Sequence, residues 1–397
     1  MEVAQIYQLA NAATTEAIGK ADLLNEDLSN IVEVGEEILN SRKLENYTRS
    51  LVDHIGKVIF VNRPYSGGIP SVLKDGWQYG SILEKIATQL PEATENETWE
   101  LQDGQSYDPN IFYKPDVTAK FYNSKTTWEI PMSFAERQVR SAFSTASQQN
   151  AFMSMLTTSI DNSATIKTEE LIMRTINNFI ADTFYDMSSI GSYGGAGNAR
   201  CVNLLKLFND RYHPAVGDTK LKAVDAVTDK DFARFAAYIL RLYVRRMQRM
   251  SVHFNIGKQP RFTTSDRMHV VMLADFVEAA NIFLQSETFH NELVKLPDAS
   301  FVPYWQGEGG AGHEYAFDQI TGIKVKTKNT NNTVVTPTGI LAVMFDNDAL
   351  GVCNVDRRVT TNYNPKAEFY SNWYKFESQY FNDHNENFVV FYVAEET

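Results

Sequence analysis

Two runs of apolar residues near the end of the chain predict strands of a buried sheet. Residues 339–345 read Gly-Ile-Leu-Ala-Val-Met-Phe, and residues 388–393 read Phe-Val-Val-Phe-Tyr-Val. Continuous apolar runs of this length are typical of strands that are covered on both faces. A turn is predicted at residues 346–348, directly after the first run. Between the two runs lies an Asn-rich segment whose aromatic residues are Tyr363, Phe369, Tyr370, Trp373, Tyr374, Phe376, Tyr380 and Phe381.

Apolar residues spaced three and four apart predict helices in the first part of the chain. One helix is expected over residues 31–55, ended by Gly56 and followed by a strand over residues 57–61. Residues 2–20 contain good helix formers but few large apolar side chains. A helix there would need a partner surface, because it cannot build a core of its own.

Two further helices are predicted in the middle of the chain. Ser133 and Glu136 form a capping-box pattern that predicts a helix start. The polar residues 161–163 predict a break in this helix. The helix after the break has one buried face, formed by Ile172, Ile176, Phe179, Ile180 and Phe184.

Residues 200–335 alternate between helical and strand patterns, as in an α/β or α+β domain. Residues 229–250 are amphipathic, with their apolar side chains on one side. A strand over residues 268–273 is expected to lead into a helix that ends near Gln285. Asp275 would lie at the start of that helix, where a carboxylate is favoured.

Residues 63–133 predict an extended loop, because proline and glycine allow only short strands and one short helix near residues 82–89. Segments this long without regular structure are uncommon in compact domains and are usually functional or disordered. The many aromatic residues argue against disorder. We expect a β-loop whose aromatic faces are covered by another molecule. Its candidate contact residues are Trp77, Tyr79, Trp99, Tyr113 and Trp128.

The net charge of the chain is −12, from 37 basic and 49 acidic side chains. This balance argues against nonspecific nucleic-acid binding, which requires a positive surface. Residues 1–56 carry four basic and ten acidic side chains, or −6, which is half of the total.

Four arginines interrupt this acidic character on one face of the 229–250 helix. They are Arg241, Arg245, Arg246 and Arg249. Three interpretations stay open: a solvated face, contacts with acidic groups of a neighbouring subunit, and nucleic-acid readout, which the net charge favours least.

The chain begins without a signal-peptide pattern, and no window reaches 18 uninterrupted apolar residues. A soluble protein without a membrane partner, made in a reducing compartment, is therefore expected. Cys201 and Cys353 belong to no metal or redox spacing. We interpret both as small buried hydrophobic residues.

No segment carries a complete catalytic, cofactor or metal motif. Residues 307–312 lack the ending of a phosphate loop, and residues 193–198 lack the glycine spacing of a dinucleotide fingerprint. Residues 290–292 and 313–314 lack the helical spacing of paired histidine ligands. Residues 346–351 lack the final glutamate of a calcium loop. No catalytic residue, cofactor or metal is therefore expected.

Three stretches of the chain share their order and character with one protein family. Residues 31–39 and 51–60 pair a helix with a first strand that opens a loop. Residues 339–352 combine a late core strand with a turn, and residues 362–393 combine an aromatic segment with a closing strand. In this order the stretches resemble tailed-phage major capsid proteins, in particular those of small podophages.

This resemblance implies the Hong Kong 97-type fold, an α+β fold that would divide the chain into five segments. They would be an N-terminal arm at residues 1–56, an extended loop at 57–132, a spine helix with the start of the peripheral domain at 133–197, an axial domain at 198–335, and a return to the peripheral domain at 336–397.

The resemblance also implies a function without a catalytic centre. Subunits would form hexamers and pentamers of an icosahedral or prolate shell, with each extended loop lying across a neighbour. The shell would enclose double-stranded DNA without sequence-specific binding and would take a portal protein at one vertex. Neither an appended immunoglobulin-like domain nor a leading scaffolding segment is expected, so scaffolding would come from a separate protein. The protein would be made in the bacterial host cytoplasm and would end in the virion.

Two other functions stay open. An encapsulin-like compartment would have the same fold around a different cargo, and an enzyme or carbohydrate-binding protein could cover a ligand with an aromatic loop. Covalent cross-linking, which occurs in part of the capsid family, would need a loop lysine. Lys74, Lys114 and Lys125 are available.

Overall fold

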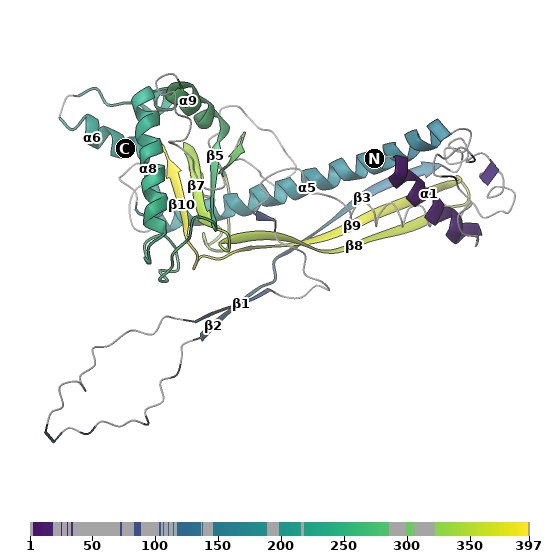
Figure 1. Ribbon diagram of the computed structural model, residues 1–397, viewed down its shortest axis with the longest axis horizontal. Coiled ribbons are helices and arrows are strands. Elements are labelled where there is room, and N and C mark those ends of the chain that lie inside the picture. The colour runs from purple at the N-terminus through teal and green to yellow at the C-terminus, as the bar shows by residue number, and fades with distance from the viewer. Residues whose placement is uncertain are drawn as a thin grey trace.

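The computed structural model describes residues 3–18, 72–73, 83–88, 117–135, 146–188, 198–215, 218–285, 299–303 and 322–395, with isolated residues between these segments. They form an elongated molecule with an α/β body at one end and a long helix and sheet that extend away from it (Figure 1). A hairpin projects from the region where these two parts meet.

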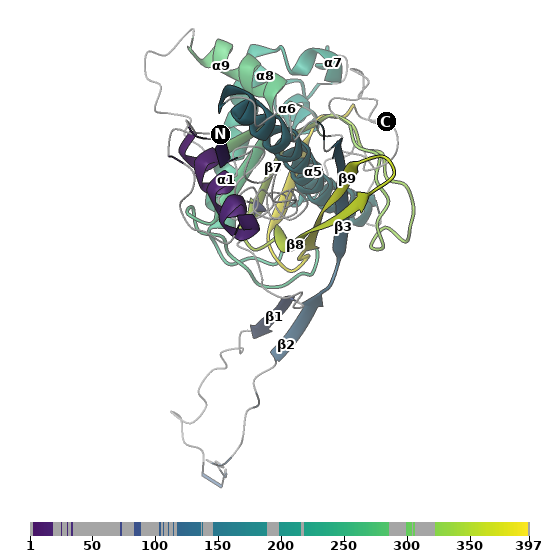
Figure 2. The ribbon, with the colours of Figure 1, turned by 90° about the vertical axis from the view of Figure 1, so that its right-hand side faces the viewer.

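Helix α5 and a three-stranded antiparallel sheet build the elongated part. Helix α5 covers Ala146–Ser188, and the sheet has the order β3–β9–β8. Its strands are β3 (Lys125–Ala135), β9 (Phe369–Asn382) and β8 (Leu350–Asn364). Burial alternates along β9, which is expected when only one face of a sheet is covered. Helix α5 contacts all three strands and runs along the sheet in both views (Figures 1 and 2).

A five-stranded sheet of order β4–β10–β7–β5–β6 forms the centre of the α/β body. Its strands are β4 (Cys201–Asn203), β10 (Phe388–Tyr392), β7 (Ile340–Asp346), β5 (Met268–Leu273) and β6 (Ala299–Val302). Every residue of β5, β7 and β10 is buried. Helices cover both faces of β10, since Phe184 of α5 contacts Tyr392, whereas Tyr243 of α8 contacts the alternate residue Phe391.

Four helices accompany this sheet. They are α6 (Leu204–Tyr212), α7 (Ala223–Ala226), α8 (Lys230–Met247) and α9 (Ala274–Gln285). Asp229 caps α8, because its side chain accepts a hydrogen bond from the backbone N–H of Phe232 at 2.7 Å. The apolar stripe of α8 is buried, as its 3.6-residue period predicts.

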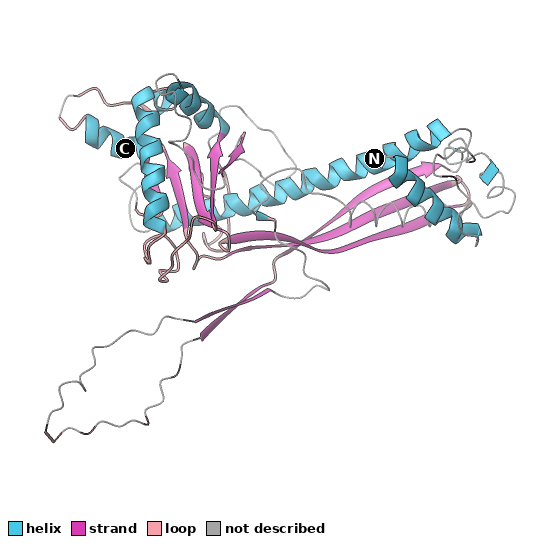
Figure 3. Cartoon of the chain, viewed as in Figure 1, coloured by secondary structure: helices cyan, strands magenta, loops and turns pink. Residues whose placement is uncertain are grey.

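The projecting hairpin consists of β1 (Leu83–Thr88) and β2 (Val117–Tyr122), which pair antiparallel. It points away from both sheets (Figures 1 and 3). Helix α1 (Val3–Ile18) lies against α5, and its small residues Ala10 and Ala13 are buried. The helix therefore has the partner surface that its composition requires.

Two predictions about the extended loop and its end were wrong. The short helix expected near residues 82–89 is strand β1, because pairing with β2 overrides its local helical pattern. Ser133 does not begin a helix but lies in β3, opposite Ser371 of β9. The capping-box pattern was misleading there because strand pairing continues to Ala135.

The break predicted at residues 161–163 was also wrong, because α5 runs through it without interruption. The hydroxyl of Thr165 donates to the carbonyl oxygen of Asp161 at 2.9 Å, and that of Thr168 donates to Ala164 at 2.9 Å. Such bonds are compatible with a continuous helix. Asp, Asn and Ser each cost less than about 1 kcal/mol inside a helix, so packing outweighs them.

Other predictions are confirmed. The apolar runs at 339–345, 388–393 and 268–273 are strands β7, β10 and β5, and α9 ends at Gln285. The α+β fold class is confirmed, and both cysteines are buried. No helix in the described ranges is long and apolar enough to cross a membrane.

Several predictions fall outside the described residues. They concern most of the 31–55 helix, the strand at 57–61, the glycine-containing segments at 193–197 and 307–312, the histidine-containing segments at 290–292 and 313–314, Lys74, and the loop aromatics Trp77, Tyr79, Trp99 and Tyr113. The four domain boundaries stay predictions.

Candidate assembly site

The turn between β9 and β10, residues 383–387, joins the three parts of the molecule, and we call it the junction turn. Its sequence is Asp-His-Asn-Glu-Asn. The N–H of Asp383 donates to the carbonyl of Ala349 at 2.7 Å, and its carboxylate accepts from the N–H of Asn385 at 3.1 Å. Asp383, Glu386 and Asn387 are buried. Buried polar groups need partners, and here the partners come from different parts of the chain.

The hairpin is attached to the junction turn through two lysines. Lys85 of β1 and Lys120 of β2 lie directly opposite each other in the ladder. Lys85 Nζ lies 2.8 Å from Asp383 Oδ2 and 2.7 Å from Glu386 Oε1, and Lys120 Nζ lies 3.0 Å from Asp383 Oδ1. Like charges opposite each other repel, and Asp383 offsets this repulsion by offering one oxygen to each lysine.

The ionisation of this cluster follows from its burial and charges. Burial alone would raise the pKa of Asp383, but Lys85, the N–H of Asn385 and Lys120 together lower it to about 2. Burial would lower the pKa of Lys85, yet Asp383 and Glu386 raise it above its ordinary value. Burial and the same two carboxylates raise the pKa of Tyr122 well above its usual range. The ion pairs therefore stay charged at neutral pH.

Helix α5 holds the junction turn from another side. His384 Nε2 lies 2.8 Å from Asp182 Oδ2, and the hydroxyl of Thr327 donates to the other oxygen of Asp182. Phe179 stacks on Phe388 with ring centroids 4.0 Å apart and an interplanar angle of 10°. Both rings are fully buried. The turn is thus fixed to the helix by a polar contact and an apolar one.

The α/β body makes the third attachment. The N–H of Gly257 donates to the carbonyl of His384 at 2.7 Å, and Asn387 Nδ2 donates to Thr263 Oγ1 at 3.1 Å. A Cβ at Gly257 would lie 2.1 Å from Asn385 Oδ1, so any larger residue at this position would force the Asn385 side chain to move. The junction turn therefore fixes the direction of the hairpin relative to α5 and to the body. Its polar groups bind residues of all three parts of the molecule.

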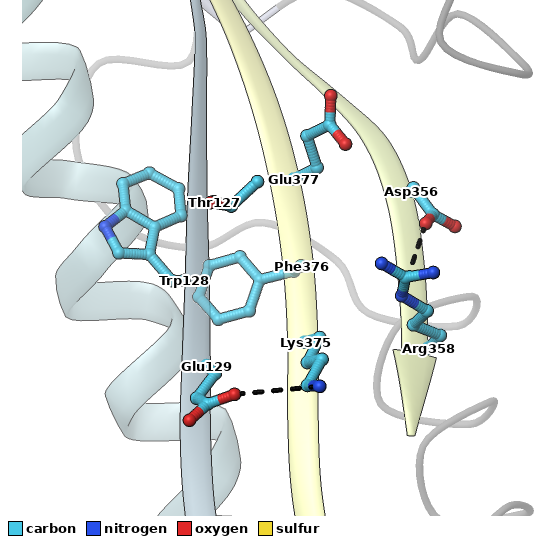
Figure 4. A pocket seen from close by; sticks show the side chains of 8 residues that line it. All are labelled: Thr127, Trp128, Glu129, Asp356, Arg358, Lys375, Phe376 and Glu377. Carbon is cyan, nitrogen blue, oxygen red and sulfur yellow. Dashed lines mark ion pairs between the residues drawn. The ribbon is translucent and has the colours of Figure 1, made fainter. Parts of the chain in front are cut away.

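A second feature is a charged pocket on the three-stranded sheet (Figure 4). Asp356 lies opposite Glu377, and Arg358 lies opposite Lys375. Unlike charges compensate along and across the strands, with Lys375 Nζ 3.8 Å from Glu129 Oε2 and Arg358 Nε 3.8 Å from Asp356 Oδ2. These exposed pairs contribute little to stability but set the charge pattern of this face.

Trp128, a predicted intersubunit contact, lies on β3 beside this pocket and points toward α5 (Figure 4). Its ring packs on Phe376 of the same chain with centroids 5.0 Å apart and is half-buried. A contact between its remaining surface and a neighbour stays a prediction.

The predicted arginines are placed together. Arg241, Arg245 and Arg249 are all exposed, on and just after α8, and their four-residue spacing puts them on one face. Arg246 lies over the ring of Tyr243, with its guanidinium carbon 5.3 Å from the ring centre. Arg246 is therefore engaged within its own chain.

Two of the residues weighed for other chemistry pair within the chain. Asp346 and Asp348 both form ion pairs with Arg267. Within the described ranges, no three His, Cys, Asp or Glu side chains are grouped to hold a metal ion. Lys114 is exposed, and Lys125 pairs with Glu377 at 2.8 Å.

The junction turn was not predicted from the sequence. Its only signal was a run of five polar residues between two apolar strands. The lysines that bind Asp383 lie about 260 and 300 residues earlier, and no local pattern connects such distant positions.

Two sequence comparisons identify relatives. The family model for Phi29-like phage major capsid proteins matches residues 10–392. The major capsid protein of Bacillus phage GA-1 is 22% identical over 307 residues, which cover 76% of this chain and 56% of that protein. The chain thus spans a little more than half the length of this curated relative.

Solved structures show the same fold. A chain in the structure of the head fibre and inner core protein of native bacteriophage P68 matches with a TM-score of 0.50 and 11% identity, covering 84% of this chain and 87% of that one. A chain in the capsid structure of Staphylococcus phage Andhra matches with a TM-score of 0.49 and 12% identity, covering 81% and 83%. The α+β architecture is the Hong Kong 97-type fold of phage capsids. Since the family model matches nearly the whole length, the chain belongs to the Phi29-like phage major capsid protein family.

Proposed function

We propose that this chain forms the shell of a phage head, with hexamers and pentamers of identical subunits enclosing double-stranded DNA. The observation that carries this proposal is the hairpin β1–β2, which projects from the body and is fixed at its root by Lys85, Lys120 and Asp383. A projecting hairpin that is held in one direction can lie across a neighbour in the same way in every subunit. Repeated contacts of this kind close a shell.

The side chains of the β1–β2 hairpin and its loop fit such a contact. Phe121 of β2 is 63% exposed, and exposed rings of this size are typical of binding surfaces. The predicted contacts Trp77, Tyr79, Trp99 and Tyr113 come from the same loop. We propose that a neighbouring subunit covers them, together with the remaining surface of Trp128.

The partners follow from this role. A portal protein would occupy one vertex, a separate scaffolding protein would guide assembly, and the DNA would be enclosed without sequence-specific binding. Synthesis would take place in the host cytoplasm, and the finished protein would reside in the virion without performing catalysis. The family match does not favour an encapsulin-like compartment or a ligand-binding enzyme.

Negative-stain electron microscopy of the chain, expressed alone and with a candidate scaffolding gene, tests the proposal. Closed shells, tubes or capsomer rings are expected. The charge-reversed variant Lys85→Glu, Lys120→Glu should form fewer and irregular particles, because the hairpin loses its fixed direction. A stable monomer in both expression conditions would refute the proposed function.

A further inference from the structure

Residues 198–285, which form a large part of the α/β body, have a charge opposite to that of the rest of the chain. Residues 198–285 hold 14 basic and 8 acidic side chains, a net charge of +6. Because the whole chain carries −12, the remainder carries −18. Two copies of the chain can therefore attract each other through unlike surfaces.

The basic charge is concentrated on the exposed face of α8. Arg241, Arg245 and Arg249 form a row there, and Tyr238 on the same helix is 53% exposed. No lysine occurs between Lys230 and Lys258. Exposed arginine and tyrosine without lysine are typical of protein–protein interfaces, in which lysine is depleted.

Exposed apolar side chains follow α8 in the sequence. Met250, Val252 and Phe262 are 50%, 40% and 52% exposed. Ser251 and Arg261 exchange backbone hydrogen bonds of 2.9 and 3.1 Å, so the residues beside them point to the opposite face of this bridge. That alternation places Met250, Val252 and Phe262 on one face. We call these three residues, together with Arg241, Arg245 and Arg249, the α8 edge.

The combination of exposed arginines with exposed apolar side chains decides between nucleic acid and protein as the partner. A phosphate backbone would satisfy the arginines but leave three large apolar side chains without a role. A protein surface with acidic groups around an apolar centre satisfies both. Helix α8 also lies in the α/β body, on the side away from the free end of α5 (Figure 1).

We infer that the α8 edge docks on an acidic surface of a second copy of this chain. The inference rests on the proposed function and adds a surface by which the α/β body of one copy meets a neighbouring copy. Acidic groups of the partner would form charge-assisted hydrogen bonds with the arginine row, and Met250 and Phe262 would be buried at the contact.

Charge reversal tests the arginine row. Sedimentation velocity of Arg241→Glu, Arg245→Glu, Arg249→Glu should show self-association at least about tenfold weaker than that of the native chain. The matched control Lys324→Glu, Lys326→Glu, Lys328→Glu reverses three exposed lysines outside the α8 edge and should leave association unchanged. Equal weakening by both variants would overturn the inference, because net charge would then control association.

A second variant tests the exposed apolar side chains of the α8 edge. Met250→Ser, Phe262→Ser should weaken association without lowering the melting temperature, since both side chains are exposed in the single subunit. Val334→Ser is the control, because Val334 is 48% exposed and lies outside the α8 edge. It should change neither the self-association nor the melting temperature. Unchanged association of the Met250→Ser, Phe262→Ser variant would contradict the inference.

A DNA-binding assay separates the remaining outcomes. Loss of double-stranded DNA binding by the triple arginine variant, with self-association intact, would overturn the inference in favour of nucleic acid. If the native chain assembles and the triple arginine variant assembles equally well, only the inference fails. If the native chain neither assembles nor self-associates, the proposed function fails with it.

Discussion

Lys85 and Lys120 lie directly opposite each other in the β1–β2 ladder, and each binds a different oxygen of Asp383. The two like charges are tolerated because this one carboxylate, 2% exposed, lies between them. The direction of the hairpin therefore depends on a residue far away in the sequence. It follows that loosening the hairpin requires no change within the hairpin itself.

Asp383→Asn should loosen the hairpin while preserving the shape of the side chain. Removing one charge from a buried ion pair leaves the two lysines opposed, and we expect a loss of about 2 kcal/mol in local stability. Amide hydrogen exchange in residues 83–88 and 117–122 should become about thirtyfold faster. Asp356→Asn, at an exposed position, is the control and should have little effect. Equal exchange rates in the two variants would contradict the role of Asp383.

Acid should remove the contribution of Asp383 in a defined range of pH. Its pKa is about 2 in the folded chain and ordinarily 3.8, so the stabilisation is complete above the ordinary value and is lost as the pH falls toward 2. The difference in thermal stability between the native chain and Asp383→Asn should be constant from about pH 5 to neutral and vanish near pH 2. A difference that already disappears near neutral pH would rule out this assignment.

Alkaline pH should weaken the same cluster by removing the positive charge of Lys85. The pKa of Lys85 is raised in the folded chain, so its stabilisation is complete below the ordinary value of 10.5 and is lost as the pH rises through the folded value. Thermal melts of the native chain and Lys85→Met should differ at neutral pH and converge only above the ordinary lysine pKa. Convergence below pH 9 would contradict the ion pairs.

Gly257→Ala should destabilise the contact between the α/β body and the junction turn. The added Cβ would meet Asn385 Oδ1 at 2.1 Å, and overpacking of this kind costs about 1 to 3 kcal/mol. The melting temperature should fall, and Asn385→Ala in the same chain should restore part of it by removing the contacted atoms. An additive effect of the two substitutions would refute the proposed clash.

Phe179→Ala should separate α5 from β10. Both Phe179 and Phe388 are fully buried and stacked, and replacing a buried phenylalanine by alanine costs about 3 to 5 kcal/mol. Phe179→Leu should cost less, because it retains most of the apolar contact. Thermal unfolding of the two variants measures the difference, and similar melting temperatures would show that the stack contributes little.

The sequence by itself determined the elements whose pattern is local and strong. The amphipathic period of α8 and the apolar runs of β5, β7 and β10 each predicted the structure, because helix period and double-sided burial are properties of neighbouring residues. The order of the stretches at residues 31–39, 51–60, 339–352 and 362–393 also suggested the capsid family, which the family match confirms.

Only the tertiary structure decided the rest. Residues 83–88 became a strand because β2 pairs with them, residues 161–163 stayed helical because α5 packs along its length, and Ser133 joined β3 because β9 extends beside it. The junction turn combines Lys85, Asp182, Gly257 and Asp383, which lie far apart in the sequence. Such contacts depend on chain topology and burial, which a local pattern does not contain.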